Sequence, residues 1–289
     1  MAQAPVEAPP PGDWRLFEVG FDNAELFLSG HIPGAGHIDT RELEQEPLWN
    51  KVSDQALLHL LLKNGIRHDT TVVLYGRNSL TAARAAHLML YAGVRDVRLL
   101  DGGLAAWNAA CLPLEDGRPL RRPAASDFGR AFPARPDYLI TTQQVKTLLL
   151  QPDGALASIR TWDEFTGKTS GYSFIEARGE IPGARWGRAG HGGNVNSMSE
   201  FHHPDGTMKA SSVISGFWNA AGIHSGQQTA FYCGTGWRAS LAFFYAWLMN
   251  WERISVYDGG WYEWSRDPGN PVVCRTDPVA GAARIPAEC

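Results

Sequence analysis

An internal repeat is the feature of this 289-residue sequence that most limits the folds open to it. The segment DGGLAAW at 101–107 recurs as DGGWYEW at 258–264. Upstream, GHIPGA at 30–35 recurs as GEIPGA at 179–184. Because the two motifs return in the same order, we expect two units that share one fold, and not a single fused sheet with an accidental repeat.

Each copy carries the same succession of elements after its first motif. An apolar, strand-like run, TVVLY at 71–75 or TAFY at 229–232, is followed by a short loop and a helix-like segment. A second strand-like run follows the helix, at 97–100 in the first copy and at 254–257 in the second. Because such alternation is typical of parallel sheets, the sequence predicts an α/β protein with two tandem domains, each a parallel sheet flanked by helices.

The domain limits follow from a proline-rich segment. Residues 116–136 hold four prolines and little hydrophobic periodicity, and therefore predict a linker between domains at 1–115 and 137–289. The second domain opens with a strand-like run at 138–140 and a helix-like run at 142–150, where the first copy has three consecutive prolines. We therefore expect the first domain to lack this leading strand and helix, or the chain to be a trimmed form.

Charge and composition argue against several kinds of partner. A net charge of −4, with scattered Lys and Arg, lacks the basic patch of a nucleic-acid binder, so no nucleic-acid partner is expected. No apolar run approaches the roughly 18 residues that span a bilayer, so no membrane partner is expected. The first residues, MAQAPVEAPPPG, lack the basic start and apolar core of a signal peptide. This favours the cytoplasm and leaves a periplasmic location open.

Cys233 stands directly after the strand-like run and directly before a helix-like segment, in the loop CGTGWR. At such a place, backbone N–H groups and the positive end of the helix favour an anion. Helix N-termini and nearby cations also lower the pKa of thiols, which makes them nucleophiles. Only the second copy carries a thiol here, because Gly76 stands at the equivalent position. The sequence therefore predicts Cys233 as the catalytic nucleophile.

The neighbours of Cys233 suit an anionic substrate. The two glycines let the backbone curl with its amides inward, the threonine offers a hydroxyl, and the arginine adds a fixed positive charge. A cysteine after a strand is commonly a buried apolar residue, but these neighbours favour the catalytic interpretation. We therefore expect a substrate-binding loop made of Gly234, Thr235, Gly236, Trp237 and Arg238.

Other residues of these types lack a comparable setting. The remaining cysteines are expected to be reduced, structural or exposed thiols: Cys111, Cys274 and Cys289. Three histidines lie in a loop with no carboxylate or thiol partner at a ligand spacing, so we expect solvated side chains and no metal site: His191, His202 and His203. Asp101 and Asp258 are expected to order their Gly-Gly turns. Four tryptophans are expected in the core or the domain interface: Trp247, Trp251, Trp261 and Trp264.

These motifs resemble those of a known family. YCGTGWRAS, an apolar helix and YDGGWYEW look like the active domain of two-domain rhodaneses, the thiosulfate and 3-mercaptopyruvate sulfurtransferases. GHIPGA and LLDGGLAAW look like their non-catalytic N-terminal domain, so the resemblance extends from about Phe17 to Val273. It implies two rhodanese-like domains and a sulfur-transfer cycle. Cys233 would take a sulfane sulfur from a small anionic donor as a persulfide, which a thiol or cyanide acceptor removes. The resemblance implies no cofactor.

The resemblance leaves the donor open between thiosulfate and 3-mercaptopyruvate. The segment Gly-Thr-Gly after Cys233 is nearer to the Gly-Ser-Gly of the mercaptopyruvate enzymes than to the Arg-Lys-Gly of the thiosulfate enzymes. Trp237 and Arg238 fit neither group. The mercaptopyruvate enzymes also bring a histidine from the first domain, and no counterpart stands between Ile38 and Leu57.

Two further positions of the family's substrate site are altered. In its Asp-x-Arg segment Ser158 replaces the aspartate, while Arg160 is retained. The substrate-binding arginine four residues later falls on Glu164. We expect Lys168 to supply the missing charge, so that Arg160 and Lys168 complete the predicted substrate site.

Two other functions share features with this interpretation. The dual-specificity cell-cycle phosphatases use the same fold with a Cys-x5-Arg loop, whereas only four residues separate Cys233 from Arg238. The smaller loop suits a sulfur atom better than a phosphate ester. Alternatively, the protein is a sulfur carrier or an interaction module that loads once and does not turn over. Turnover with small acceptors distinguishes these functions.

Overall fold

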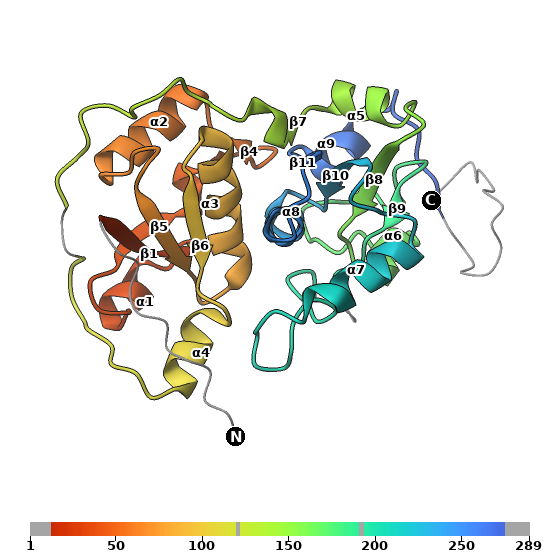
Figure 1. The fold of residues 1–289 in the computed structure, drawn as a ribbon. Helices are drawn as coiled ribbons and strands as arrows, with labels where there is room; N and C mark the ends of the chain where they lie inside the picture. Colours follow the sequence, from red (N-terminus) through yellow and green to blue (C-terminus); the bar gives the residue numbers. More distant parts are fainter. Residues whose placement is uncertain (1–12, 120–121, 191–193, 275–289) are drawn as a thin grey trace.

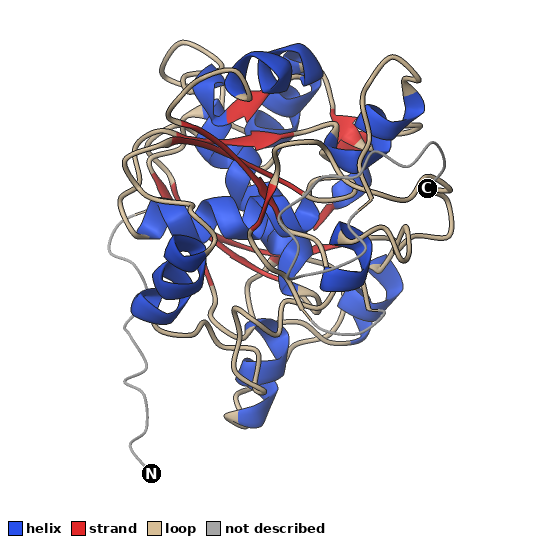
Figure 2. Cartoon of the chain, turned by 90° about the vertical axis from the view of Figure 1, so that its right-hand side faces the viewer, coloured by secondary structure: helices blue, strands red, loops and turns tan. Residues whose placement is uncertain are grey.

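The structure is a computed structural model that describes residues 13–119, 122–190 and 194–274. The chain forms two units side by side, and helices α3 and α8 face each other between them (Figure 1). Figure 2, turned by 90°, shows strands in the interior with helices around them. This arrangement confirms the prediction of two tandem α/β domains.

Four parallel strands form the sheet of the first domain, in the order β2-β1-β5-β6. Its strands are β1 (Trp14–Gly20), β2 (Gly36–Asp39), β5 (Thr71–Tyr75) and β6 (Asp96–Leu99). Its helices are α1 (Ala24–Ser29), α2 (Asp54–Lys63), α3 (Ser79–Ala92) and α4 (Gly103–Ala109), with the 3-10 turn η1 (Thr40–Glu42). A small antiparallel pair, β3 (Glu44–Gln45) and β4 (Asn50–Lys51), projects toward the second domain.

Five parallel strands form the sheet of the second domain, in the order β7-β11-β10-β8-β9. Its strands are β7 (Leu139–Ile140), β8 (Gly154–Ser158), β9 (Arg185–Trp186), β10 (Gln228–Tyr232) and β11 (Ile254–Tyr257). Its helices are α5 (Thr142–Leu148), α6 (Trp162–Phe165), α7 (Ser211–Ala220), α8 (Trp237–Leu248) and α9 (Gly260–Arg266), with the 3-10 turn η2 (Pro136–Tyr138).

The two sheets share one strand order, as the repeat predicts. The order across the first sheet is β2-β1-β5-β6, and across the second sheet it is β9-β8-β10-β11, with β7 added at the edge next to β11. Strand β7 and helix α5 have no counterpart within residues 13–119. The catalytic loop predicted from the sequence leaves the carboxyl end of β10, a strand paired on both sides.

Residues 122–135, which lead into η2, follow the outer face of the first domain (Figure 1). Ala125 donates its backbone N–H to Leu62 at 2.8 Å, and Ala134 donates to Ala92 at 3.0 Å. This segment belongs to the first domain by its contacts and leads into the second. We propose that the domains divide here, with limits at 1–115, 116–136 and 137–289.

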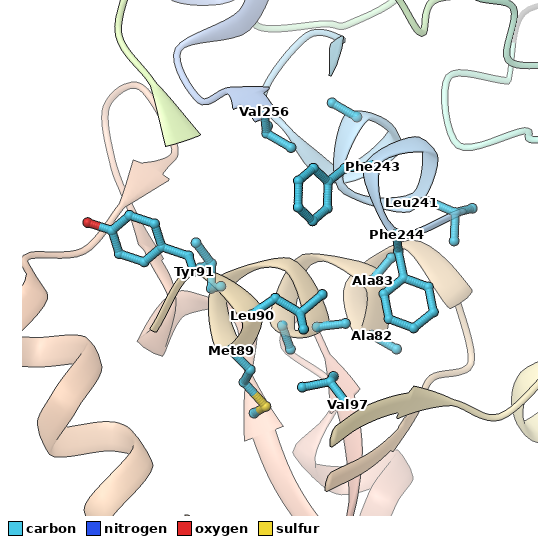
Figure 3. Packing of buried hydrophobic residues seen from close by; sticks show 14 of the residues in the cluster. Ala82, Ala83, Met89, Leu90, Tyr91, Val97, Leu241, Phe243, Phe244 and Val256 are labelled. Atoms are coloured by element: carbon cyan, nitrogen blue, oxygen red, sulfur yellow. The ribbon is translucent and has the colours of Figure 1, made fainter. Parts of the chain in front are cut away.

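Helices α3 and α8 form the centre of the domain interface. Both are mainly apolar and buried along most of their length, which is typical of helices at the centre of an interface. Figure 3 shows Phe244 of α8 beside Ala83 of α3, with Phe243 also on the side of α8 that faces α3. Because each helix follows the loop of its own domain, their packing sets the position of the catalytic loop relative to the first domain. In the described residues we find no helix that is long and apolar enough to cross a membrane.

Candidate active site

Cys233 lies between β10 and α8 and is 1% exposed. Its Sγ accepts a hydrogen bond from the backbone N–H of Gly236 at 3.2 Å. The loop therefore places the sulfur against a backbone donor at the N-terminal end of a 12-residue buried helix. This is the environment in which a sulfur anion is stabilised.

Two glycines of the loop are required by their surroundings. A Cβ on Gly234 would lie 2.3 Å from the ring of Tyr172, so no side chain fits at this position. Gly236 has a φ of +110°, a conformation that favours glycine, and it directly precedes α8. A Cβ on Gly236 would also lie 3.1 Å from Nη1 of Arg84. The loop is therefore enclosed by Tyr172 from its own domain and by Arg84 from the first domain.

The repeated Asp-Gly-Gly motif supports the loop from behind. Gly260 has a φ of +56°, and a Cβ there would lie 2.5 Å from the carbonyl oxygen of Gly234. The next two residues donate backbone N–H groups to the loop, from Trp261 to Cys233 at 2.8 Å and from Tyr262 to Gly234 at 3.1 Å. The second half of the motif therefore orients the carbonyl groups of the catalytic loop away from the sulfur.

A cavity of about 410 Å³ opens beside the loop, between the two domains. The loop contributes Thr235, Trp237 and Arg238 to its wall. The first domain contributes Phe21, Glu44 and Trp49, and residues 171–174 and 195–196 complete the lining. Three of the predicted substrate residues therefore meet in one cavity, and Trp237 lies at the pocket as expected.

Arg238 is fully buried and already has a partner. Its Nη1 and Nη2 donate to the two carboxylate oxygens of Glu164 at 2.8 and 2.9 Å, and Nη2 also donates to the hydroxyl of Tyr172 at 3.1 Å. Burial alone would raise the pKa of Glu164, but the charge and hydrogen bonds of Arg238, together with Arg160, lower it to about 2. Arg238 thus faces the cavity as part of an ion pair, and not as a free cation.

Arg160 and Lys168 do not line the cavity. Arg160 is buried behind Glu164, where its Nη1 donates to the carbonyl of Gly179 at 2.7 Å and its guanidinium lies 4.9 Å from the ring of Trp261. Lys168 has a side chain that is 72% exposed and pairs with Asp163 at 2.9 Å. The geometry thus gives Arg160 a supporting position and gives no support to the predicted role of Lys168 in substrate binding.

Buried charges of the first domain reach the loop from the other side. Arg84 of α3 donates to Asp258 at 2.6 Å and to Glu44 at 3.2 Å, while Glu44 also accepts from Nε1 of Trp237 at 2.7 Å. Nη1 of Arg84, the atom next to Gly236, has no hydrogen-bond partner among the described residues. This network connects the first domain to the catalytic loop through charged side chains.

The two aspartates of the repeated motif do not order their own turns, so that prediction is wrong. Asp258 accepts from the backbone N–H of Lys51 at 2.7 Å and from Arg84, both in the first domain. Asp101 accepts from the backbone N–H of Met208, in the second domain, at 2.8 Å. Each aspartate therefore joins one domain to the other, because the turn that carries it lies at the interface.

The sequence analysis did not identify Glu44, Arg84 and Tyr172 as site residues. A single arginine within the apolar stretch that forms α3 is a signal for Arg84, because an arginine on a fully buried helix requires a partner. Glu44 and Tyr172 lie in a two-residue strand and a loop, and no pattern in the sequence distinguishes them. They are recognised only once the domains are packed together.

The other cysteines and histidines lie outside this site. Cys111 is an exposed free thiol, as expected, whereas Cys274 is disulfide-bonded, which corrects the expectation of a reduced thiol there.

His202 is half-buried, with its Nε2 2.6 Å from the hydroxyl of Tyr245, and is not the solvated residue that we expected. His203 is exposed. Cys289 and His191 lie outside the described residues. Within the described residues no cluster of ligands suits a metal ion.

The tryptophans of the second domain pack as expected. Trp251, Trp261 and Trp264 are buried, and Trp247 lies against Phe244 with ring centroids 5.5 Å apart. Trp261 and Trp264 belong to α9, which begins within the motif that supports the loop. These side chains therefore hold the catalytic loop in place and are not part of the cavity wall.

The chain has two domains of the same fold. The second carries a cysteine between a buried parallel strand and a helix, and the first carries Gly76 at the equivalent position. This combination defines a class of proteins. Residues 10–110 and 141–267 each match the rhodanese-like domain, and the chain belongs to the rhodanese family.

Within the family, the chain is 55% identical to the thiosulfate sulfurtransferase YnjE of Escherichia coli K12, over 92% of this chain and 61% of YnjE. The crystal structure of YnjE superposes with a TM-score of 0.90 at 54% identity, over 94% of this chain and 65% of that chain. The chain therefore spans less than two thirds of the length of YnjE.

Two further relatives bear on the chemistry. The sulfur carrier protein TtuD of Thermus thermophilus is 31% identical, over 89% of this chain and 90% of TtuD. The anaerobic ergothioneine biosynthesis enzyme from Chlorobium limicola, solved with its natural substrate trimethyl histidine, has a TM-score of 0.88 at 36% identity. That match covers 95% of this chain and 67% of the enzyme. The relatives thus include a thiosulfate sulfurtransferase, a biosynthesis enzyme and a sulfur carrier protein.

Proposed function

We propose that this protein is a sulfurtransferase that moves a sulfane sulfur from a small anionic donor to a thiol or cyanide acceptor through a persulfide on Cys233. One observation carries the proposal: Sγ of Cys233 accepts from the Gly236 N–H at the start of α8, beside a cavity of about 410 Å³. The relation to YnjE supports the same chemistry.

The proposed reaction has two steps. The Cys233 thiolate attacks the outer sulfur of thiosulfate, a new S–S bond forms, and sulfite leaves with the electron pair of the broken S–S bond. Cyanide then attacks the outer sulfur of the persulfide, thiocyanate leaves, and the thiolate returns. Thr235, Trp237 and Arg238 would contact the donor, because they form the wall of the cavity next to the loop.

The test compares thiosulfate and 3-mercaptopyruvate as donors with cyanide as the acceptor, and measures thiocyanate. We expect many turnovers per Cys233 with at least one donor, and none with Cys233→Ser. A single equivalent of transferred sulfur would instead indicate a carrier, a function supported by the relation to TtuD. Hydrolysis of a phosphate ester in the same series, without thiocyanate, would indicate a phosphatase.

A second acceptor class is favoured by the lining of the cavity. The positive charge of Arg238 is paired with Glu164. The rest of the wall includes five aromatic residues and one carboxyl group: Phe21, Trp49, Tyr172, Phe174, Trp237 and Glu44. Aromatic faces with a carboxylate suit an organic cation such as a trimethylammonium group. The related enzyme from Chlorobium limicola binds trimethyl histidine. Incubation of sulfur-loaded protein with trimethyl histidine, followed by mass spectrometry for ergothioneine, tests this candidate.

The compartment is also a proposal. We propose the cytoplasm, with the periplasm as the alternative. The disulfide at Cys274 supports the alternative, because disulfides persist in oxidising compartments. Cell fractionation with an antibody against the native protein distinguishes the two locations.

A further inference from the structure

Glu44 is a buried carboxyl group at the active site that the persulfide cycle does not use. It belongs to the first domain, is 2% exposed, and lines the cavity beside the catalytic loop. Its Oε1 accepts from Nε1 of Trp237, which directly follows Gly236 in the loop. Its Oε2 accepts from Nε of Arg84 at 3.2 Å. The carboxyl group is therefore held at the wall of the cavity by one residue from each domain.

Sulfur acceptors with an S–H group must lose a proton before they attack a persulfide. A thiol such as 2-mercaptoethanol is largely protonated at neutral pH, and the thiolate is the nucleophile. The cations nearest the loop are poor bases, because guanidinium groups do not lose their protons in proteins. Among the described residues that line the cavity, only Glu44 carries a carboxyl group.

We infer that Glu44 is a catalytic residue that accepts the proton of the acceptor thiol during the second half of the sulfur-transfer cycle. The S–H proton moves to a Glu44 carboxylate oxygen, and the acceptor sulfur attacks the outer sulfur of the Cys233 persulfide. The bond between that sulfur and Sγ breaks, and Sγ leaves with the electron pair as a thiolate. The acceptor departs with the outer sulfur as a persulfide anion, and Glu44 returns its proton to solvent. This inference rests on the proposed sulfurtransferase function.

The electrostatics of the carboxyl group suit this role. Burial raises the pKa of Glu44 to about 7, although Arg84 and the hydrogen bond from Trp237 lower it and Asp258 raises it further. The charged groups that face Glu44 are thus Arg84 of α3 and Asp258 after β11, with Trp237 of α8 as a neutral donor. A base with a pKa close to the working pH is the most effective at taking a proton near neutrality.

The test times sulfur transfer from protein that has first been loaded with one sulfur by thiosulfate. The acceptors are 2-mercaptoethanol, which must lose a proton, and sulfite, which attacks as an anion. We expect Glu44→Gln to lower the rate with 2-mercaptoethanol about 100-fold more than the rate with sulfite at pH 7. Glu164→Gln, which removes another buried carboxyl group near the loop, is the matched control and should lower both rates by the same factor.

A second variant keeps the inference testable if Glu44→Gln does not fold. Trp237→Phe removes a hydrogen bond that stabilises the carboxylate, so the rise of the 2-mercaptoethanol rate with pH should move to higher pH. Equal losses with both acceptors in Glu44→Gln, or an unmoved pH profile in Trp237→Phe, would overturn the assignment. Failure of the wild-type protein to load sulfur at all would instead refute the proposed function.

Discussion

Trp261 donates its backbone N–H to the carbonyl oxygen of Cys233 at 2.8 Å, and this bond has a counterpart in the other domain. Leu104 donates to the carbonyl of Gly76, the residue at the position of Cys233, at 3.2 Å. In both domains a glycine of the Asp-Gly-Gly motif lies directly beneath the loop, Gly260 in one and Gly103 in the other. The repeat therefore preserves a loop support, and only the second domain uses it to hold a thiol.

Alanine at Gly260 should disturb the catalytic loop. Its Cβ would lie 2.5 Å from one loop carbonyl and 2.7 Å from another, at a φ of +56°. We expect Gly260→Ala to destabilise the protein by roughly 1–3 kcal/mol and to reduce sulfur loading of Cys233. Gly103→Ala is the matched control, since φ is +57° there and the nearest carbonyl oxygen, that of Gly76, is 2.6 Å away.

Urea unfolding and mass spectrometry of donor-treated protein check this pair of variants. Gly103→Ala should show a similar loss of stability with normal loading. Normal loading kinetics in Gly260→Ala would mean that the motif does not control the geometry of the loop.

Arg238→Ala should affect stability as well as turnover, because the structure buries this residue against Glu164. Removal of Arg238 leaves the buried carboxylate of Glu164 with Arg160 as its remaining cation among the described residues, and should cost roughly 3–5 kcal/mol. Donor turnover should fall about 10- to 100-fold, the equivalent of a charge-assisted contact of ~1.5–3 kcal/mol. Arg238→Lys should recover only part of the lost turnover, since an ammonium group cannot donate two parallel hydrogen bonds to the Glu164 carboxylate.

A double variant, Arg238→Met with Glu164→Gln, separates the effect on stability from the effect on turnover. It removes both charges together, so stability should return toward that of the wild type while turnover stays low. Steady-state rates and urea unfolding of the three variants provide the measurement. Wild-type turnover in the double variant would place the Arg238 side chain outside the catalytic function.

The Glu164 carboxylate should make stability depend on pH under acidic conditions. Burial opposes its charge, but Arg238 lowers its pKa from the ordinary 4.5 to about 2 in the folded protein. Between pH 2 and pH 4.5 this carboxyl group therefore binds a proton more readily in the unfolded chain than in the folded protein. The contribution to stability, roughly 3 kcal/mol, is therefore complete above about pH 4.5 and is lost as the pH falls toward 2.

Urea unfolding at pH 5.0 and at a series of lower values measures this slope. Glu164→Gln should be less stable at pH 5 and should lose less stability on acidification than the wild type. Parallel stability curves for the two proteins would contradict the low pKa of the Glu164 carboxyl group.

Phe243 tests the packing between the domains. Its ring lies 4.7 Å from that of His87 and 4.9 Å from that of Tyr138, within the contact between α3 and α8 (Figure 3). Phe243→Ala should cost roughly 3–5 kcal/mol, since it leaves a cavity at the centre of the interface. Phe174→Ala, at a side chain that is 47% exposed, should change stability by less than about 1 kcal/mol in the same thermal or urea unfolding experiment. Similar losses in the two variants would mean that the α3–α8 contact is not the main interface.

Much of the fold could be predicted because it rests on local patterns and on their repetition. The two motifs and the strand-like runs identified β5, β6, β10 and β11, and the repeat identified the tandem domains. The setting of Cys233 between a strand and a helix was also visible, since a loop of glycines, a hydroxyl and an arginine is continuous in the sequence.

What the sequence did not reveal depends on contacts between distant segments. Arg238 ends the loop as expected, but its charge is paired because α6 brings Glu164 to it. Asp258 looks like a turn residue until α3 presents Arg84, and Glu44 reaches the cavity only through the small β3–β4 pair. Such pairings between segments far apart in the chain leave no periodic signal in a single sequence.

The central claim is that Cys233, and no other residue, carries the transferred sulfur. Mass spectrometry of intact and digested protein, after incubation with thiosulfate or 3-mercaptopyruvate, tests it most directly. We predict a gain of about 32 Da, one sulfur atom, on the peptide that contains Cys233, and its removal by cyanide. Cys111→Ser should load normally, because Cys111 is an exposed thiol outside the site. Sulfur on Cys111 in the wild type, or a loaded Cys233→Ser protein, would contradict the account.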